Sequence, residues 1–205
     1  MPSSAIIQDV SDDGESYLIY FFFDFKDAAK QDNRALLSSF LIQLSSQSNL
    51  CFKTLFDIYS KHDHGARQPS EGTLLGCLEH MLRALGQAPI YLIVDALDEC
   101  PNTSKTPGSP RSRQEVLEVV KELVKLRLRT LHICVTSRPE FDIRDSLEKL
   151  ATFKLSLHDQ DGQKQDIAEY VRSVIYSDKE PVMMKWGEDI KHLVAETLSD
   201  KANGM

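Results

Sequence analysis

Three short apolar runs alternate with longer amphipathic stretches, and this alternation constrains the fold more than any other feature of the 205-residue sequence. The runs lie at residues 17–23, 90–94 and 131–135 and are rich in aromatic or β-branched side chains. Wholly apolar strands are typical of a sheet that is covered on both faces, and strands that alternate with helices favour parallel pairing. The sequence therefore predicts an α/β domain with a mainly parallel sheet.

Helical periodicity fills most of the sequence between and after these runs. Apolar residues recur there at three- and four-residue spacing, which is the period of one buried helical face. Asp32 or Asn33 can cap the first of these helices, and Gly86 can end the second. We expect helices at about 33–44, 73–85, 114–129, 166–176 and 188–198.

Two segments break the helical pattern. Residues 151–157 alternate apolar and polar side chains, so we expect a peripheral strand with one buried face. Residues 101–113 contain three prolines, which predicts a surface loop. We expect the basic side chains of that loop to be solvated, and they are Lys105, Arg111 and Arg113.

Charge and composition limit the possible partners and location. Lysine and arginine number 24 against 31 aspartates and glutamates, so the formal net charge is −7, which argues against binding to a phosphate backbone. The apolar runs are far too short to span a bilayer, and no charged-then-apolar leader opens the sequence. The four cysteines form no CxxC pair, so neither a zinc site nor a disulfide framework is indicated. We expect a cytoplasmic protein that binds neither nucleic acid nor membrane.

The second apolar run ends abruptly in carboxylates. Asp95 follows it directly, and Asp98 and Glu99 come three and four residues later. Ligands of open parallel sheets bind outside the carboxyl ends of the strands, where a carboxylate can hold Mg²⁺ and a second one can orient an attacking water. The residues alone leave a second interpretation open, in which the three carboxylates make a solvated acidic turn that caps the next helix.

The third run ends in Thr-Ser-Arg-Pro, which places Arg138 at the same edge of the expected sheet. A guanidinium pairs with two oxygens at once and is suited to phosphate charge, although arginine at a strand end is more often an ion-pair partner. His132 lies inside this run, which predicts a buried core histidine. For Cys100 and Cys134, both near the same edge, we expect a packing role.

The two strand-end motifs together resemble a known family. Residues 91–100, YLIVDALDEC, resemble the Walker B segment of the fungal NACHT-type NTPases, also described as nephrocystin-like N-terminal modules of the STAND class. Residues 134–140, CVTSRPE, resemble their sensor 1 strand. The aromatic run with the helix after it, and residues 159–174, are similar to further segments of the same family.

This resemblance implies a three-layer P-loop NTPase-like core that works as a nucleotide-driven signalling switch. By resemblance, Asp95 would coordinate Mg²⁺, Asp98 or Glu99 would polarise the attacking water, and Arg138 would sense the γ-phosphate. The implied cofactors are Mg²⁺ and ATP or GTP.

The sequence departs from the family pattern in one respect. It contains no GxxxxGK[ST] phosphate loop, and residues 3–10 resemble the end of the helix that follows that loop. We therefore expect a partial core over 1–158, without its first strand and phosphate loop, followed by the start of a helical segment over 159–205. Such a chain would bind nucleotide tightly only if the loop were restored, and it would not hydrolyse it alone.

Two functions from different classes stay open for such a chain. The first is a piece of a NACHT-type switch with NTPase ancestry. The second is a non-catalytic interaction module that keeps the fold and associates with itself or with full-length NACHT relatives. The missing phosphate loop favours the second function for this chain, whereas the two strand-end motifs favour the first.

Overall fold

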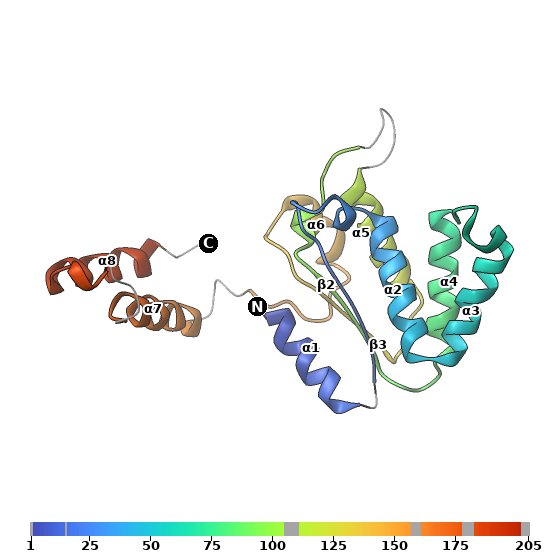
Figure 1. The fold of residues 1–205 in the computed structure, drawn as a ribbon, viewed down its shortest axis with the longest axis horizontal. Helices are drawn as coiled ribbons and strands as arrows, with labels where there is room; N and C mark the ends of the chain where they lie inside the picture. The colour runs from blue at the N-terminus through green and yellow to red at the C-terminus, as the bar shows by residue number, and fades with distance from the viewer. Residues whose placement is uncertain (1, 15, 105–110, 157–160, 178–182, 202–205) are drawn as a thin grey trace. The chain divides into compact units, whose positions relative to one another are not determined.

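The computed structural model has two compact units, Met1–Ala151 and Thr152–Met205 (Figure 1). The first contains a sheet with helices packed on it, and the second contains two helices. The residues that the structure describes are 2–14, 16–104, 111–156, 161–177 and 183–201.

A parallel sheet of three strands forms the centre of the first unit, which confirms the predicted fold class. The strands lie side by side in the order β1 (Tyr17–Phe22), β2 (Ile90–Asp95) and β3 (Leu131–Val135). Tyr17 is opposite Ile90, and Ile90 is opposite Leu131, so the strands are in step. Their carboxyl ends therefore meet at one edge of the sheet.

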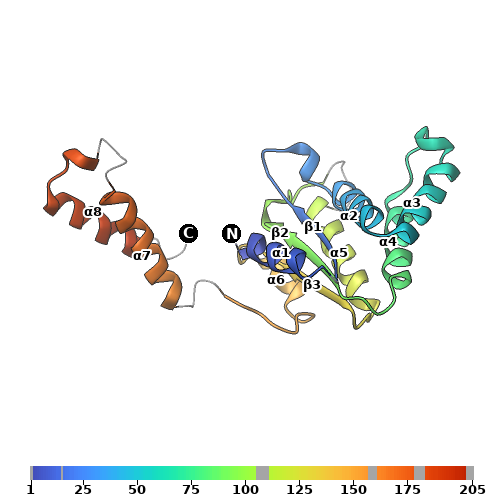
Figure 2. The same cartoon turned by 60° about the horizontal axis from the view of Figure 1, so that its bottom comes forward.

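Helices cover both faces of the sheet (Figures 1 and 2). The face that carries α2 and α5 holds most of the core, and α1 lies on the other face. Asp32 accepts a hydrogen bond from the Ala35 N–H, which confirms the predicted cap of α2. The helices of this unit are α1 (Pro2–Asp13), α2 (Asn33–Gln47), α3 (Asn49–Lys61), α4 (Glu71–Ala84), α5 (Ser112–Lys125) and α6 (Phe141–Leu147).

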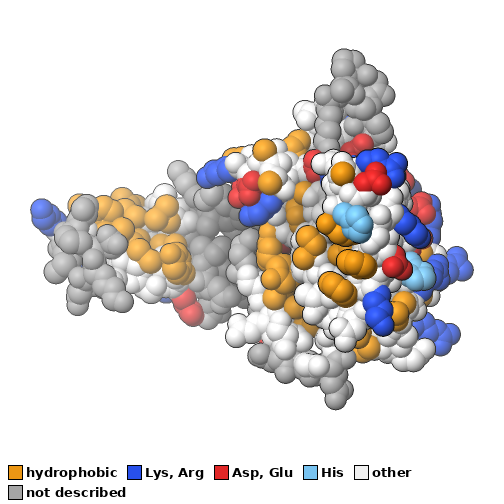
Figure 3. All heavy atoms as spheres, turned by 45° about the vertical axis from the view of Figure 1, so that its right-hand side comes forward, with side chains coloured by type: hydrophobic (Ala, Val, Ile, Leu, Met, Phe, Trp, Pro, Cys, Tyr) orange, Lys and Arg blue, Asp and Glu red, His pale blue; other side chains and the backbone are white. Residues whose placement is uncertain are grey.

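The helices predicted from periodicity include α2, α4 and α5 but not α3 or α6. Helix α3 is poorly buried, because Cys51 is its only fully buried residue. Figure 3 brings forward the side on which α3 lies in Figure 1, and it shows apolar side chains among charged ones. The large apolar side chains of α3 that stay about half exposed are Leu50, Phe52, Phe56 and Tyr59.

The two outer edges of the sheet differ. Along β1, the Gln47 side-chain amide accepts from the Leu18 N–H at 2.9 Å and donates to the Leu18 carbonyl at 2.7 Å. The Gln43 amide makes the same pair of bonds to Tyr20, at 3.0 and 2.8 Å. Two glutamines of α2 therefore take the place of a neighbouring strand. Among the described residues, β3 has a strand partner on its β2 side alone.

The expected strand at 151–157 is wrong over 151–156, which have no regular secondary structure, and Leu157 lies outside the described residues. Phe153 is 92% exposed and Leu155 is 71% exposed. An alternating segment forms a strand only when a sheet edge pairs with it, and in the structure these residues have no such partner.

The second unit is a pair of helices that pack on each other, α7 (Asp161–Ile175) and α8 (Glu188–Lys201). Both helices were predicted from their apolar periodicity. Ile175 of α7 and Ala195 of α8 are buried. Across the described ranges, no helix has both the length and the apolar character needed to cross a membrane.

Candidate functional site

Asp95 is the last residue of β2 and is only 3% exposed. Its carboxylate accepts a hydrogen bond from the hydroxyl of Thr136, which directly follows β3. The same hydroxyl oxygen accepts from the Ala96 N–H at 3.1 Å. One threonine therefore joins the carboxyl ends of two neighbouring strands and fixes the buried carboxylate.

The chain turns sharply at Ala96, whose φ of 53° lies in the left-handed region that alanine rarely adopts. The turn places Leu97 in the core, and the Leu97 N–H donates to the Thr136 carbonyl at 3.0 Å. A short 3-10 turn over Leu97–Glu99 follows and carries the other two carboxylates. Backbone strain of this kind persists only where surrounding contacts over-determine the conformation.

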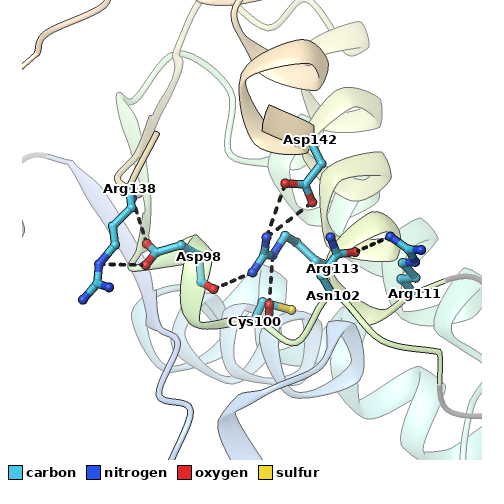
Figure 4. Close-up of polar contacts among 7 residues, drawn as sticks. All are labelled: Asp98, Cys100, Asn102, Arg111, Arg113, Arg138 and Asp142. Carbon is cyan, nitrogen blue, oxygen red and sulfur yellow. Dashed lines mark hydrogen bonds and ion pairs between the residues drawn. The ribbon is translucent and has the colours of Figure 1, made fainter. Parts of the chain in front are cut away.

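Asp98 holds the segment that follows β3 (Figure 4). Its Oδ1 accepts from the backbone N–H of Arg138 at 2.9 Å, and its Oδ2 lies 3.5 Å from the Arg138 Nε. The Asp98 side chain is 11% exposed, whereas that of Arg138 is 82% exposed. The arginine thus lies on the surface beside a carboxylate that is nearly buried.

Glu99 reaches in the opposite direction. Its Oε2 accepts from the backbone N–H of Phe25 at 3.2 Å, in the segment that follows β1. The Phe23 N–H also donates to the Asp95 carbonyl at 3.1 Å. The acidic turn therefore connects the segments after all three strands.

The structure brings all four predicted site residues to one edge of the sheet, at the ends of β2 and β3. The alternative in which the acidic turn caps the next helix is wrong. That helix, α5, begins thirteen residues after Glu99, at Ser112 with Arg111 in the capping position, and the carboxylates of Asp98 and Glu99 bond to other segments.

Arg113 was expected to be solvated, and that prediction is wrong, because the residue is only 7% exposed. It lies in the first turn of α5 and points toward the acidic turn (Figure 4). Its Nε donates to the Cys100 carbonyl at 2.9 Å and its Nη2 to the Asp98 carbonyl at 2.6 Å. Its Nη1 pairs with Asp142 of α6, at 3.3 and 3.4 Å from the two carboxylate oxygens.

Sequence reasoning therefore missed three residues of this edge, which are Thr136, Arg113 and Asp142. One signal could have found Arg113, because it lies three and four residues before Val116 and Leu117 and so shares their buried helical face. For Asp142, no pattern in the sequence marks it as the partner of Arg113.

Two further predictions concerned His132 in β3 and the cysteines near this edge. His132 is exposed and stacks on the Tyr91 ring with centroids 5.0 Å apart, so the predicted core histidine is wrong. Cys100 is buried, as expected. Burial, and to a lesser extent the Asp95 charge, raise the pKa of the Cys134 thiol, which keeps this group protonated at neutral pH.

The chemistry of the edge fits Mg²⁺ in one restricted way. Within the described ranges, no group of three or more His, Cys, Asp or Glu side chains could hold a metal ion by itself. Magnesium is commonly bound through one or two carboxylates, with waters and substrate phosphates completing its shell. Asp95, with the Thr136 hydroxyl beside it, offers oxygen atoms suited to that mode.

The sequence matches the family model described as Nephrocystin 3, N-terminal, over residues 1–138. The matched range contains all three strands of the sheet and ends at Arg138. No curated protein and no solved structure matches the sequence. Because the match spans well over half of the 205 residues, this chain belongs to the nephrocystin 3 N-terminal family.

Proposed function

We propose that the carboxyl edge of the sheet is the magnesium and γ-phosphate half of a nucleotide site, in a switch of the NACHT type described in fungi. The observation that carries the proposal is the convergence of Asp95, Asp98, Glu99 and Arg138. These residues come from the ends of two strands, and they lie where open parallel sheets bind their ligands.

Each residue has a role that its surroundings support. Asp95 would bind Mg²⁺, because it is fixed by Thr136 and stands at the end of the central strand. Arg138 would contact the γ-phosphate, because its side chain is exposed at the same edge. Asp98 or Glu99 would orient the attacking water, and each carboxylate would have to release a present partner, Arg138 or the Phe25 N–H, to do so. Mg²⁺ would neutralise part of the negative charge of the nucleotide phosphates.

These 205 residues contain no GxxxxGK[ST] loop, so the backbone N–H groups and lysine that hold the β- and γ-phosphates in P-loop enzymes are missing from them. Three carboxylates and one arginine leave the edge with a negative formal charge. The edge alone would therefore attract Mg²⁺ more readily than a negatively charged nucleotide. We expect weak nucleotide binding and no hydrolysis by this chain by itself.

The second candidate is a non-catalytic module that pairs with related chains. The observation that favours it is the contrast between the sheet edges, since glutamines close the β1 edge and no described strand pairs with the outer side of β3. A strand edge with open backbone groups is a template for pairing with another chain.

Equilibrium binding of a fluorescent ATP analogue in the presence of Mg²⁺ separates the two candidates. The 205-residue chain is compared with a loop-bearing chain, in which a strand and a GxxxxGK[ST] loop precede the same sequence. We expect saturable binding to the loop-bearing chain and at least tenfold weaker binding to the 205-residue chain. Asp95→Ala should weaken binding to the loop-bearing chain at least tenfold.

The matched control is Glu118→Ala, which removes an exposed carboxylate that lies within α5 and not at the end of a strand. It should leave the affinity unchanged. If the loop-bearing chain does not bind, or if Asp95→Ala binds as well as the parent, the edge is not a nucleotide site. Concentration-dependent self-association of the 205-residue chain would then support the interaction module.

A further inference from the structure

Arg113 is the only arginine among the buried residues of the described chain, and it binds two different segments. It donates to the carbonyls of Asp98 and Cys100 and pairs with Asp142 in the first turn of α6. A cation in the first turn of a helix is opposed by the helix dipole. Its burial in α5 therefore depends on these acceptors.

The contacts of Arg113 close a ring (Figure 4). Arg113 holds the Asp98 carbonyl, and the Asp98 carboxylate holds the backbone N–H and side chain of Arg138. Two residues later Glu140 directly precedes α6, and α6 carries Asp142 back to Arg113. The position of Arg138 is thus tied to the acidic turn on one side and to α6 on the other.

The geometry of the guanidinium suits this task. Its planar fork donates in three directions at once, through Nε, Nη1 and Nη2, whereas a lysine ammonium is a flexible point charge. The two carbonyls that Arg113 binds belong to Asp98, in the acidic turn, and to Cys100, directly after that turn. Loss of the fork would free the turn without removing any side chain from the site itself.

We infer that Arg113 is a positioning residue: it braces the acidic turn against Asp142, and so fixes Asp98 where it retains Arg138. One part of the inference rests on the proposed function: the bracing determines how readily the Arg138 side chain leaves Asp98 to contact a nucleotide phosphate. Arg113 would touch neither the phosphate nor the metal and would act through the residues that it binds in the acidic turn and in α6. The bracing belongs to the chain itself and needs no nucleotide.

The test is site-resolved amide hydrogen exchange on the 205-residue chain. The reporter is the Arg138 N–H, whose acceptor is the Asp98 carboxylate. We expect Arg113→Lys to speed its exchange at least fivefold relative to the amides of β2. Asp142→Asn, at a side chain that is one-third exposed, should have a smaller effect in the same direction. Asp98→Asn removes the carboxylate itself, so its exchange rate shows how large the effect is when the contact between Asp98 and the Arg138 N–H is changed directly.

The matched control is Arg111→Lys, two residues away. Arg111 is exposed, and the one hydrogen bond that Figure 4 draws for it goes to the side chain of Asn102, at 3.4 Å. This substitution should leave the Arg138 amide unchanged. Unchanged exchange in Arg113→Lys would overturn the inference. A rise shared equally by the β2 amides would also overturn it, because that result reports a global loss of stability.

A second measurement separates this inference from the proposed function. In the loop-bearing chain, Arg113→Lys should change the affinity for the fluorescent ATP analogue at least threefold, and Arg111→Lys should not. If the parent chain binds no nucleotide while the exchange result holds, the proposed function fails and the positioning role stands. If nucleotide binds and the exchange result fails, the positioning role alone is wrong.

Discussion

At the scale of single residues, the Thr136 hydroxyl has two partners at the candidate site. It donates to the Asp95 carboxylate and accepts from the Ala96 N–H. Thr136→Val keeps the shape but deprives the buried Asp95 carboxylate and the partly buried Ala96 N–H of this hydroxyl, so we expect the free energy of unfolding to fall by about 2 kcal/mol. Urea unfolding measures the change.

Thr136→Ser is the matched control, because it keeps the hydroxyl and loses only a methyl group. It should retain most of the stability that Thr136→Val loses. Equal losses in the two variants would mean that Thr136 stabilises the fold through its methyl group and not through its hydrogen bonds.

Cys77 gives the chain a pH-dependent stability in alkaline solution. Burial, with a smaller contribution from Cys51, raises the pKa of its thiol from 9.0 to about 11. Between these values the unfolded chain loses the Cys77 proton while the folded chain keeps it, so rising pH favours unfolding. Below pH 9 this thiol adds no pH dependence.

We expect the urea midpoint of the parent chain to fall more between pH 8 and 10.5 than that of Cys77→Ala. The variant is less stable at pH 8 because of the cavity, so the comparison rests on the change with pH within each chain. An equal fall in both chains would contradict the raised pKa.

The sequence predicted Asp95, Asp98, Glu99 and Arg138 because each follows an apolar strand, and strand ends determine where a parallel sheet presents its side chains. It did not predict Arg113, because a basic residue beside a proline-rich segment looks solvated. Only the tertiary structure brings the acceptors from α6 and the acidic turn to that side chain.

At the scale of elements, α2 both covers the sheet and closes its β1 edge. The Gln43 and Gln47 amides bind the backbone of Tyr20 and Leu18 as a neighbouring strand would. Replacing both glutamines with alanine exposes these backbone groups. We expect stronger concentration-dependent self-association, measured by sedimentation velocity, because an open edge is a template for strand pairing.

The control is Ser45→Ala with Ser46→Ala, which removes two hydroxyls that bond only within α2. Its association should match that of the parent chain. If the glutamine variant also sediments like the parent at every concentration, the glutamines do not protect the edge.

The elements that periodicity predicted are those with a continuous buried face. In α2, five apolar side chains at helical spacing are all buried, so the pattern and the packing coincide. In α3 the apolar residues also recur at helical spacing, but four of its large apolar side chains stay about half exposed. Residues 151–156 show a strand pattern in the sequence but have no neighbouring strand to pair with in the structure.

At the scale of the whole molecule, the two compact units meet in sequence at residues 151 and 152. Chymotrypsin should cut first after Phe153, because proteases need an extended chain and this side chain is 92% exposed. Phe141 provides an internal control, since it is 84% exposed but lies in α6. Mass spectrometry of the first products identifies the cut.

The N-terminal product should keep a cooperative thermal transition, because the sheet and its packed helices all lie before residue 152. First cleavage after Phe141, or loss of the transition on cleavage after Phe153, would contradict the division into two units.

The proposed function of the whole chain depends on recognition of the γ-phosphate of a nucleotide, with Mg²⁺, at the edge of the sheet. The most direct measurement is titration calorimetry of Mg-ATP and Mg-ADP into the loop-bearing chain and its Arg138→Ala variant. We expect about tenfold tighter binding of ATP than of ADP, roughly 1.4 kcal/mol, and loss of this preference in Arg138→Ala. An undiminished preference in the variant, or equal affinity for the two nucleotides in the parent, would contradict the proposal.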